Sequence, residues 1–450
     1  MEIDKGKLEH QPLSQLYSAL IALEPKAITG YVPRNASEQK VAFLNGDIRN
    51  PQHDYDRLDA IDFDERKRAV SVAGDAVLAS EEMNPKFISA YEQFIEGYKA
   101  RTHLMELAQL YNHEADSAIK ARLRDEYMKL NIDLYGAPDE VTYRSLLQEK
   151  LAAIADKDFE GEAATLRDEL FSMANYIPGG INPERFTPSN ETMEWMGDIV
   201  KGLYDSMLSR IPADKKVFNP QEVKTLFDGI VAEEFGGSAG DWQVDIEEAK
   251  AINVKTTEKR IVIPIDREEI SVDTLRGLIV HEIGVHMLRA VMGGETNLEP
   301  LANGLSNYYD AEEGLGVVME QALRGKFREA GIDHYITAGL AYFDGKDFRD
   351  AYEIKWRLSA LEKLRDGEEV TDDIRKKSQN TAYGSTMRSL RGTDELPWFK
   401  DLSYYNGAVD IWRHLEEIRG DDIRFMFVLL GKNDPSSKVH ERLIYETSSK

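Results

Sequence analysis

The chain has 450 residues, of which 42% are hydrophobic and 30% are charged. This length and composition suit one large or two ordinary globular domains and exclude disorder as the dominant state. The 81 acidic and 56 basic residues give a net charge of -25, which argues against general binding to nucleic acids and to anionic membranes.

The chain contains no cysteine. Disulfides, thiol nucleophiles and cysteine-ligated metal centres are therefore excluded, and any metal site must use His, Asp or Glu. The N-terminal residues lack the basic start and apolar core of a signal peptide, and no apolar run approaches the roughly 18 residues that cross a bilayer. We expect a soluble, cytoplasmic protein with no membrane partner and no nucleic-acid partner.

Residues 1–85 are predicted to be an N-terminal extension of unknown role. A short amphipathic segment, Leu13 to Leu23, precedes a polar and turn-rich stretch, and we interpret the whole as a solvated arm or a loosely docked helical lead-in. From Asn84 onward, apolar residues recur at spacings of three and four, which predicts helices. Further helices are expected at about 114–130, 139–155, 159–175, 188–209 and 220–235.

The apolar period changes after residues 236–240. Trp242, Val244 and Ile246 alternate with polar residues, and KRIVIPI at 259–265 predicts a second strand, with Asn253 in the connection. Helices resume after Ser271, a predicted N-cap, and continue to the C-terminus. The expected fold class is α+β, mostly α, with one small β-sheet.

The helix after Ser271 carries His281, Glu282 and His286. Zinc hydrolases usually place two histidines four residues apart so that both face one ion. Here the spacing is five, and at about 100° per residue an undisturbed α-helix turns the two side chains about 140° apart. A π-bulge restores a common direction, and we expect it at Gly284, between the histidines. Two ordinary histidines on a buried helix are the alternative interpretation.

A second helix is predicted over 306–325, with Asp310 near its start. Glu313 and Glu320 are seven residues apart and share one face, and a carboxylate that faces protein is costly unless it is paired or bound to metal. We expect Glu313 to complete a His₂Glu zinc site and Glu320 to act as a hydrogen-bond partner behind it. The alternative is a solvated pair, Glu312 and Glu313, in the first helical turn.

HEIGVH followed by EEGLG resembles the tyrosine carboxypeptidase family (MATCAP-like), which includes the animal microtubule-associated enzyme. Bacterial relatives are labelled flavohaemoglobin-expression-modulating QEGLA-motif proteins. The resemblance extends from about residue 85 to 420. It also includes LYGAPDEVTY at 134–143, RSLRG at 388–392 and FKDLSYYNG at 399–407.

The resemblance implies zinc ligands at His281, His286 and Glu313, and a catalytic Glu282. It also implies a zincin-like metallopeptidase core, with a small β-sheet, an HExxxH helix and a glutamate helix. Residues 86–450 would form this carboxypeptidase domain, with 86–235 as its helical part and 236–450 as its metal-site part. Where the family has QEGLA, this chain has Glu312 and Gly316 at the first and last positions, and Glu312 adds negative charge beside the metal.

A carboxypeptidase must bind the terminal carboxylate of its substrate, and arginine does so with two parallel hydrogen bonds. Arg388 and Arg391 are three residues apart at a predicted helix end, so both are candidates. Lys400 and Tyr404, four apart, add a cation and a hydroxyl donor, and Tyr404 is a candidate to hold the developing oxyanion. Surface charges near helix ends are the alternative interpretation.

These residues and the resemblance together predict a zinc-dependent carboxypeptidase that removes a C-terminal residue from peptides or proteins, and the resemblance implies that this residue is Tyr or Phe. Zinc polarises the scissile carbonyl and acidifies its bound water, and Glu282 takes the proton and passes it to the leaving amine. Two alternatives stay open: a zinc endopeptidase, and a non-catalytic zinc-binding regulatory protein. An intact Glu282 beside three ligands argues against the regulator, because structural zinc sites normally have four protein ligands.

Overall fold

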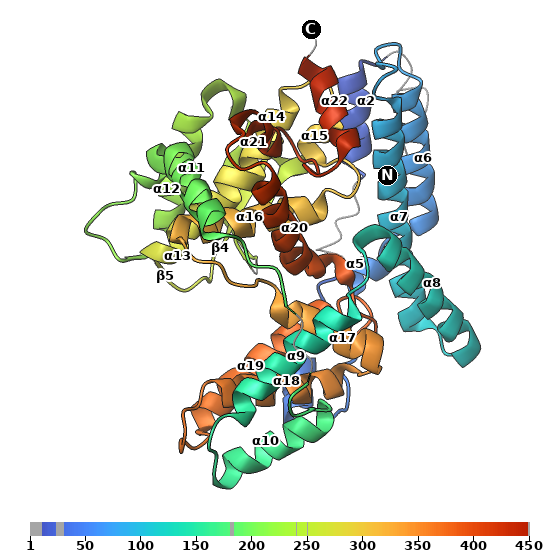
Figure 1. Ribbon diagram of the computed structural model, residues 1–450. Helices are drawn as coiled ribbons and strands as arrows, with labels where there is room; N and C mark the ends of the chain where they lie inside the picture. The colour runs from blue at the N-terminus through green and yellow to red at the C-terminus, as the bar shows by residue number, and fades with distance from the viewer. Residues whose placement is uncertain (1–10, 24–30, 181–183, 240, 250, 449–450) are drawn as a thin grey trace.

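The computed structural model describes residues 11–23, 31–180, 184–239, 241–249 and 251–448. This part of the chain is mostly helical and contains two small sheets (Figure 1), which confirms the expected α+β, mostly α class. Within it, no helix combines the length and the apolar character needed to cross a membrane.

Most helices of the first 135 residues form a layer along one side of the molecule, blue to teal in Figure 1, whereas the helix over 36–45 contacts residues 348–383. Helix α2 packs on α6, α6 on α7, and α7 on α8. Asp62 and Asp116 accept hydrogen bonds from the first backbone amides of α6 and α8, which fixes where these two helices begin. The helices are α2 (Leu13–Ile21), α4 (Ala36–Asn45), α5 (Asp56–Asp59), α6 (Phe63–Leu78), α7 (Ile88–His113) and α8 (Ser117–Tyr135).

The interpretation of residues 1–85 as a solvated arm is wrong for the residues that the structure describes. Helix α2 is amphipathic, as expected, but its apolar face is buried against α6 and α7. Phe43 is fully buried, with its ring centroid 5.1 Å from that of Phe348 and 4.8 Å from that of Tyr352. The polar composition misled the prediction because a few large aromatic residues, spaced widely, supply the buried contacts of this segment.

Two distant stretches of the sequence combine into a helical lobe, at the bottom of Figure 1. Helices α9 and α10 of the first stretch pack on α17 and α18 of the second, and α18 packs on α19. The lobe consists of α9 (Glu140–Ala155), α10 (Gly161–Met173), α17 (Ile332–Asp344), α18 (Phe348–Glu362) and α19 (Asp372–Ser389).

The remaining helices belong to the part of the molecule that contains the main sheet, and α12 packs directly on that sheet. They are α11 (Asn190–Leu208), α12 (Pro220–Glu234), α13 (Val272–Leu278), α14 (Leu288–Gly294), α15 (Pro300–Asn303), α16 (Tyr309–Arg324), α20 (Ser403–Glu417), α21 (Asp422–Leu429) and α22 (Lys438–Ser448). The helices predicted near 188–209, 220–235 and 306–325 are thus confirmed.

The main sheet has three strands in the order β2 (Gln243–Glu247), β4 (Arg260–Pro264), β3 (Asn253–Lys255). Strands β2 and β4 run parallel, with Val244 opposite Ile261, and β3 is antiparallel to β4. The two predicted strands are confirmed, but Asn253 begins a third strand rather than a connection. A second pair, β1 (Val217–Phe218) with β5 (Ile270–Ser271), was also missed, because two residues are too short to show a period.

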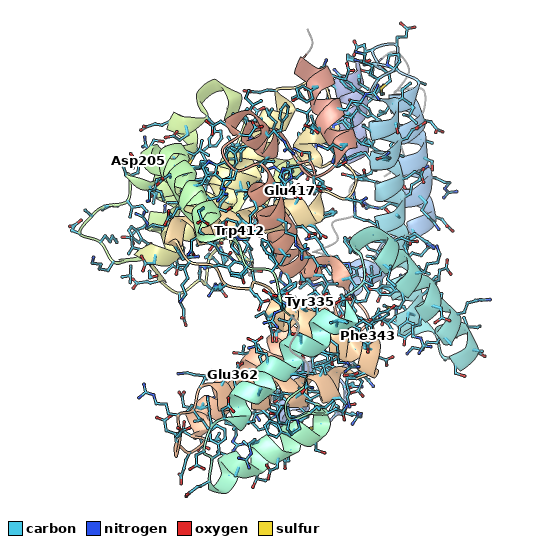
Figure 2. All side chains as sticks on the ribbon, viewed as in Figure 1. Asp205, Tyr335, Phe343, Glu362, Trp412 and Glu417 are labelled. Carbon is cyan, nitrogen blue, oxygen red and sulfur yellow. The ribbon has the colours of Figure 1, made fainter. Side chains whose placement is uncertain are left out.

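Helices α16 and α20 cross in direct backbone contact. A Cβ atom on Gly314 would lie 2.1 Å from the carbonyl carbon of Gly407, and one on Gly407 would lie 1.9 Å from the carbonyl oxygen of Asp310. The crossing therefore requires glycine on both helices. Further along α20, the buried Trp412 (labelled in Figure 2) donates a hydrogen bond from Nε1 to Gln321 of α16 at 2.9 Å.

Candidate metal centre and substrate pocket

The helix that follows β5 changes its winding at the two histidines. Ser271 caps α13, as expected, by accepting a hydrogen bond from the backbone amide of Thr274. Residues Ile279–Met287 are π-helical and continue directly into α14. The predicted π-bulge is confirmed, and it extends over nine residues instead of one turn around Gly284.

Gly284 lies against Tyr204 of α11. A Cβ atom at Gly284 would approach the Tyr204 ring to 2.6 Å, and the Tyr204 hydroxyl donates a hydrogen bond to the Gly284 carbonyl at 2.8 Å. The wider π-helical turn leaves carbonyl groups without their usual α-helical donors, and Tyr204 satisfies this one.

His281, His286 and Glu313 converge, with one potential ligand atom from each lying within 4.8 Å of the others. Oε2 of Glu313 is 4.0 Å from Nε2 of His281 and 3.8 Å from Nε2 of His286. Bonds of about 2.0–2.1 Å to a tetrahedral zinc ion would separate these atoms by about 3.3 Å. Two imidazole nitrogens and a carboxylate oxygen at this spacing therefore fit zinc after small side-chain movements.

Both imidazoles are held from behind by carboxylates. Nδ1 of His281 donates to Glu320 at 2.8 Å, as expected for Glu320, and Nδ1 of His286 donates to Glu312 at 2.8 Å. Burial alone would lower the pKa of His281, but the hydrogen bond to Glu320 and the surrounding carboxylates raise that pKa to about 9. The site thus attracts positive charge and directs both Nε2 atoms toward Glu313.

Glu282 is 8% exposed and lies at the pocket wall beside the histidines. Burial raises the pKa of its carboxyl group, and the two neighbouring histidines partly oppose this shift. Among the described residues, none forms a hydrogen bond or ion pair with the Glu282 carboxylate. This carboxylate is therefore available to accept a proton from a molecule in the pocket.

Glu312 does not add an uncompensated charge to the site. Its carboxylate pairs with the fully buried Arg289 at 2.5 Å and with Lys432 at 2.9 Å. Burial by itself would raise the pKa of Glu312, but the charges of Lys432 and Arg289 hold that pKa well below its usual range. The two cations neutralise the extra negative charge that the sequence placed beside the metal ligands.

Gly316, the other departure from the QEGLA pattern, faces His281. A Cβ atom at Gly316 would lie 2.6 Å from Cε1 and 2.7 Å from Nε2 of the His281 ring. Here the absence of a side chain allows the imidazole to lie directly against α16.

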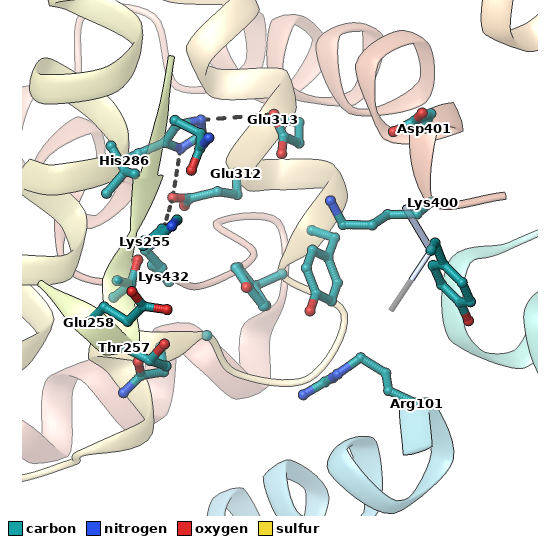
Figure 3. A pocket seen from close by; sticks show the side chains of 18 of the residues that line it. Arg101, Lys255, Thr257, Glu258, His286, Glu312, Glu313, Lys400, Asp401 and Lys432 are labelled. Atoms are coloured by element: carbon teal, nitrogen blue, oxygen red, sulfur yellow. Dashed lines mark hydrogen bonds and ion pairs between the residues drawn. The ribbon is translucent and has the colours of Figure 1, made fainter. Parts of the chain in front are cut away.

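A cleft of about 2700 Å³ opens in front of these residues. Figure 3 shows His286, Glu312 and Glu313 on one side of it, with Lys400 and Arg101 on the other. Helices α7 and α8 contribute lining residues and form one wall of the cleft. Arg388, Arg391 and Tyr404 also line the cleft.

Arg388 is already engaged. Its Nε and Nη2 atoms donate to the two oxygens of Asp401 at 2.6 and 3.1 Å, and Nη2 also lies 3.4 Å from the Tyr404 hydroxyl. The negative charge of Glu313, together with burial, raises the pKa of Tyr404. Tyr404 therefore stays a neutral phenol that can donate a hydrogen bond into the cleft.

Of the residues predicted to bind substrate, Arg391 and Lys400 are the cations that remain available to a ligand. The guanidinium of Arg391 lies 5.0 Å from the centre of the Trp398 ring, and Nζ of Lys400 lies 5.4 Å from that of Tyr309. Among the described residues, neither cation has a carboxylate partner. Burial lowers the pKa of Arg391, which marks a desolvated cation that a bound carboxylate would stabilise.

The comparison with known families gives one result. The sequence model for the microtubule-associated tyrosine carboxypeptidase matches residues 196–437. The chain belongs to this family. Membership implies a tyrosine carboxypeptidase, which is a protease that acts on the C-terminus of a peptide or protein. No curated protein matches the chain.

The match to the microtubule-associated tyrosine carboxypeptidase family covers more than half of the chain, including the π-helical segment, α16 and the motifs at 388–392 and 399–407. We expected the resemblance to begin near residue 85, but the match to the family begins at residue 196. LYGAPDEVTY at 134–143 lies outside the match.

Two residues that contact Glu312 were not predicted. Arg289 lies on α14 and Lys432 lies after α21, and both reach Glu312. The position of Arg289, three residues after His286, was a usable signal, because residues three apart on a helix are neighbours. Lys432 lies 120 residues from Glu312 in sequence, and no local pattern connects the two.

Replacement of Glu312 by alanine is expected to lower the free energy of unfolding by about 3–5 kcal/mol, because Arg289 and Lys432 would stay buried without their carboxylate. Chemical denaturation in the presence of a chelator measures this change on the metal-free protein. Glu81→Ala, which removes an exposed carboxylate, is the control and should leave the midpoint unchanged. Equal stability of Glu312→Ala and wild type would contradict the charge cluster.

Proposed function

We propose that this protein is a zinc-dependent carboxypeptidase with a zincin-like core. The observation that carries the proposal is the convergence of His281, His286 and Glu313 beside a carboxylate without a partner, Glu282, in a cleft that also holds Arg391. Three protein ligands leave one position of a tetrahedral ion open, as in catalytic zinc sites.

His281, His286 and Glu313 would hold the ion, with Glu320 and Glu312 orienting the two imidazoles. When bound, zinc supplies a Lewis acid for the scissile carbonyl and lowers the pKa of a water molecule. Glu282 is the general base, since it follows a ligand in sequence and has no competing partner. It accepts the proton of the attacking water and donates it to the leaving amine.

Arg391 binds the terminal carboxylate of the substrate, and Lys400 adds a second positive charge. Nη2 of Arg388 lies within hydrogen-bond distance of the Tyr404 hydroxyl, and Arg388 is itself held by Asp401. The Tyr404 hydroxyl, close enough to Glu313 for that charge to raise its pKa, is placed to donate a hydrogen bond to the oxyanion that develops at the scissile carbonyl.

We expect the enzyme to release a C-terminal Tyr or Phe from peptides with a free carboxylate, and an amidated C-terminus to block cleavage. The guanidinium of Arg391 pairs strongly only with a charged carboxylate. No acidic tail should be required, because the protein carries a net charge of -25 and repels one. Mass spectrometry on matched free-acid and amide peptides measures the cleavage.

In the same assay, Arg391→Ala should raise KM for the free acid by about 10- to 100-fold, the loss expected for a charge-assisted pair. Zinc content should stay at wild-type level. Arg122→Ala, which removes an exposed arginine on α8, is the matched control. Equal cleavage of acid and amide, or cuts at internal bonds, would favour the endopeptidase alternative.

A further inference from the structure

The loop that carries Arg391 is held by the N-terminal segment, which lies outside the family match. Residues 391–396 connect α19 to the segment that leads into the 3-10 turn at Phe399–Leu402, and contacts to this loop come from Tyr31, His53 and Tyr55 and from helices α7 and α8. The family match begins at residue 196. The family match therefore covers the loop but not the N-terminal residues that contact it.

Tyr55 and His53 bind the loop directly. The Tyr55 hydroxyl accepts a hydrogen bond from the backbone amide of Gly392 at 3.3 Å and donates to Oδ1 of Asp394 at 3.0 Å. Nδ1 of His53 lies 2.5 Å from the same Asp394 oxygen. Nε2 of His53 lies 3.2 Å from the Tyr383 hydroxyl, which ties this contact to α19. One carboxylate thus joins the loop to two side chains of the N-terminal segment.

The loop needs such support because its backbone is unusual. Gly392 and Asp394 have φ angles of 95° and 60°, and a residue with a side chain, such as Asp394, rarely adopts the left-handed region. The Tyr31 ring closes over the first of these positions, where a Cβ atom on Gly392 would lie 2.8 Å from it. Conformations of this kind persist where surrounding contacts hold them.

Arg391 depends on this backbone for its direction. Among the described residues, its guanidinium has no hydrogen-bond or ion-pair partner, and its ring contact is with Trp398. Trp398 in turn packs edge-on against Tyr31, with ring centroids 5.4 Å apart. Tyr31 and Tyr55 both reach the cleft as lining residues.

We propose that Tyr31, His53 and Tyr55 are positioning residues for Arg391, so that the N-terminal segment is a working part of the carboxylate-binding site. This inference rests on the proposed role of Arg391 in binding the substrate carboxylate. The three side chains act through Gly392, Asp394 and Trp398, and they contact none of the candidate metal ligands.

The test compares Tyr55→Phe and Asp394→Asn with wild type on a peptide that ends in a free tyrosine. Each variant removes hydrogen bonds while keeping the size of the side chain. We expect KM to rise about 5- to 10-fold, as for the loss of one hydrogen bond or two, with kcat within twofold and zinc content unchanged. Arg49→Ala is the control, because it removes ion pairs from the same segment to Asp347 and Asp350, away from the loop.

A double-mutant cycle separates positioning from general stability. If Tyr55 acts through Arg391, then Tyr55→Phe has no further effect on KM in an Arg391→Ala background. The same factor in both backgrounds would overturn the inference, as would an unchanged KM in Tyr55→Phe alone. If Arg391→Ala raises KM and Tyr55→Phe does not, only this inference fails. If Arg391→Ala itself leaves KM unchanged, the proposed role of Arg391 fails with it.

Discussion

Glu282→Gln is expected to lower the turnover number by about 10²- to 10⁴-fold while the protein keeps one zinc ion per chain. Glutamine preserves the size of the side chain but cannot accept the proton of the attacking water. The buried position of Glu282, without a partner among the described residues, leaves no other role that this substitution would disturb. Steady-state hydrolysis of a tyrosine-ending peptide and metal analysis of the same preparation measure the two quantities.

Glu295→Gln is the matched control. Glu295 lies at the C-terminal end of α14, the helix that continues from the π-helical segment, and this variant should retain wild-type turnover. Hydrolysis by Glu282→Gln at the wild-type rate would remove Glu282 from the mechanism. If wild type and variant are equally inactive on a broad panel of peptides, the regulatory alternative becomes the better explanation.

The second large effect is expected from the histidines. His281→Ala and His286→Ala should each abolish stoichiometric zinc binding and, with it, peptide hydrolysis, because two remaining ligands do not hold the ion firmly. A chelator should inactivate the wild-type protein, and added zinc should restore it. Metal analysis after dialysis measures occupancy in each variant.

His113→Ala serves as the control for these variants, since His113 is an exposed residue that pairs with Asp59 and is not one of the three converging candidate ligands. It should keep full zinc occupancy. Full occupancy in both His281→Ala and His286→Ala would rule out the assigned site.

The π-helical distortion was predictable because its signal is local. Two histidines five residues apart cannot face one ion on a regular α-helix. If both bind the ion, one turn between them must contain an extra residue, and the glycine between them is a suitable place for it. The pairing of Glu320 with His281 was predictable for a similar reason, since the seven-residue spacing from Glu313 places both carboxylates on one face of α16.

The environment of Glu312 and the docking of the N-terminal segment were not predictable in this way. Lys432 reaches Glu312 only because the chain returns to the site after α21, and Phe43 meets Phe348 across some 300 residues. A polar composition predicts only that most side chains of a segment face solvent. One buried aromatic residue in such a segment is enough to pack it against the rest of the protein. Arg388, predicted to bind substrate, does line the cleft, but its pairing with Asp401 depends on a turn that the sequence does not reveal.

The glycine crossing of α16 and α20 bears on how rigidly the two proposed catalytic sides of the cleft are joined. Glu313 stands next to Gly314 on one helix, and Tyr404 stands one turn before Gly407 on the other. Because the two backbones touch at the crossing, neither helix can slide along its neighbour without a steric clash. The spacing between Glu313 and Tyr404 is therefore constant, so the proposed metal ligand and the proposed oxyanion donor belong to one rigid frame around the scissile bond.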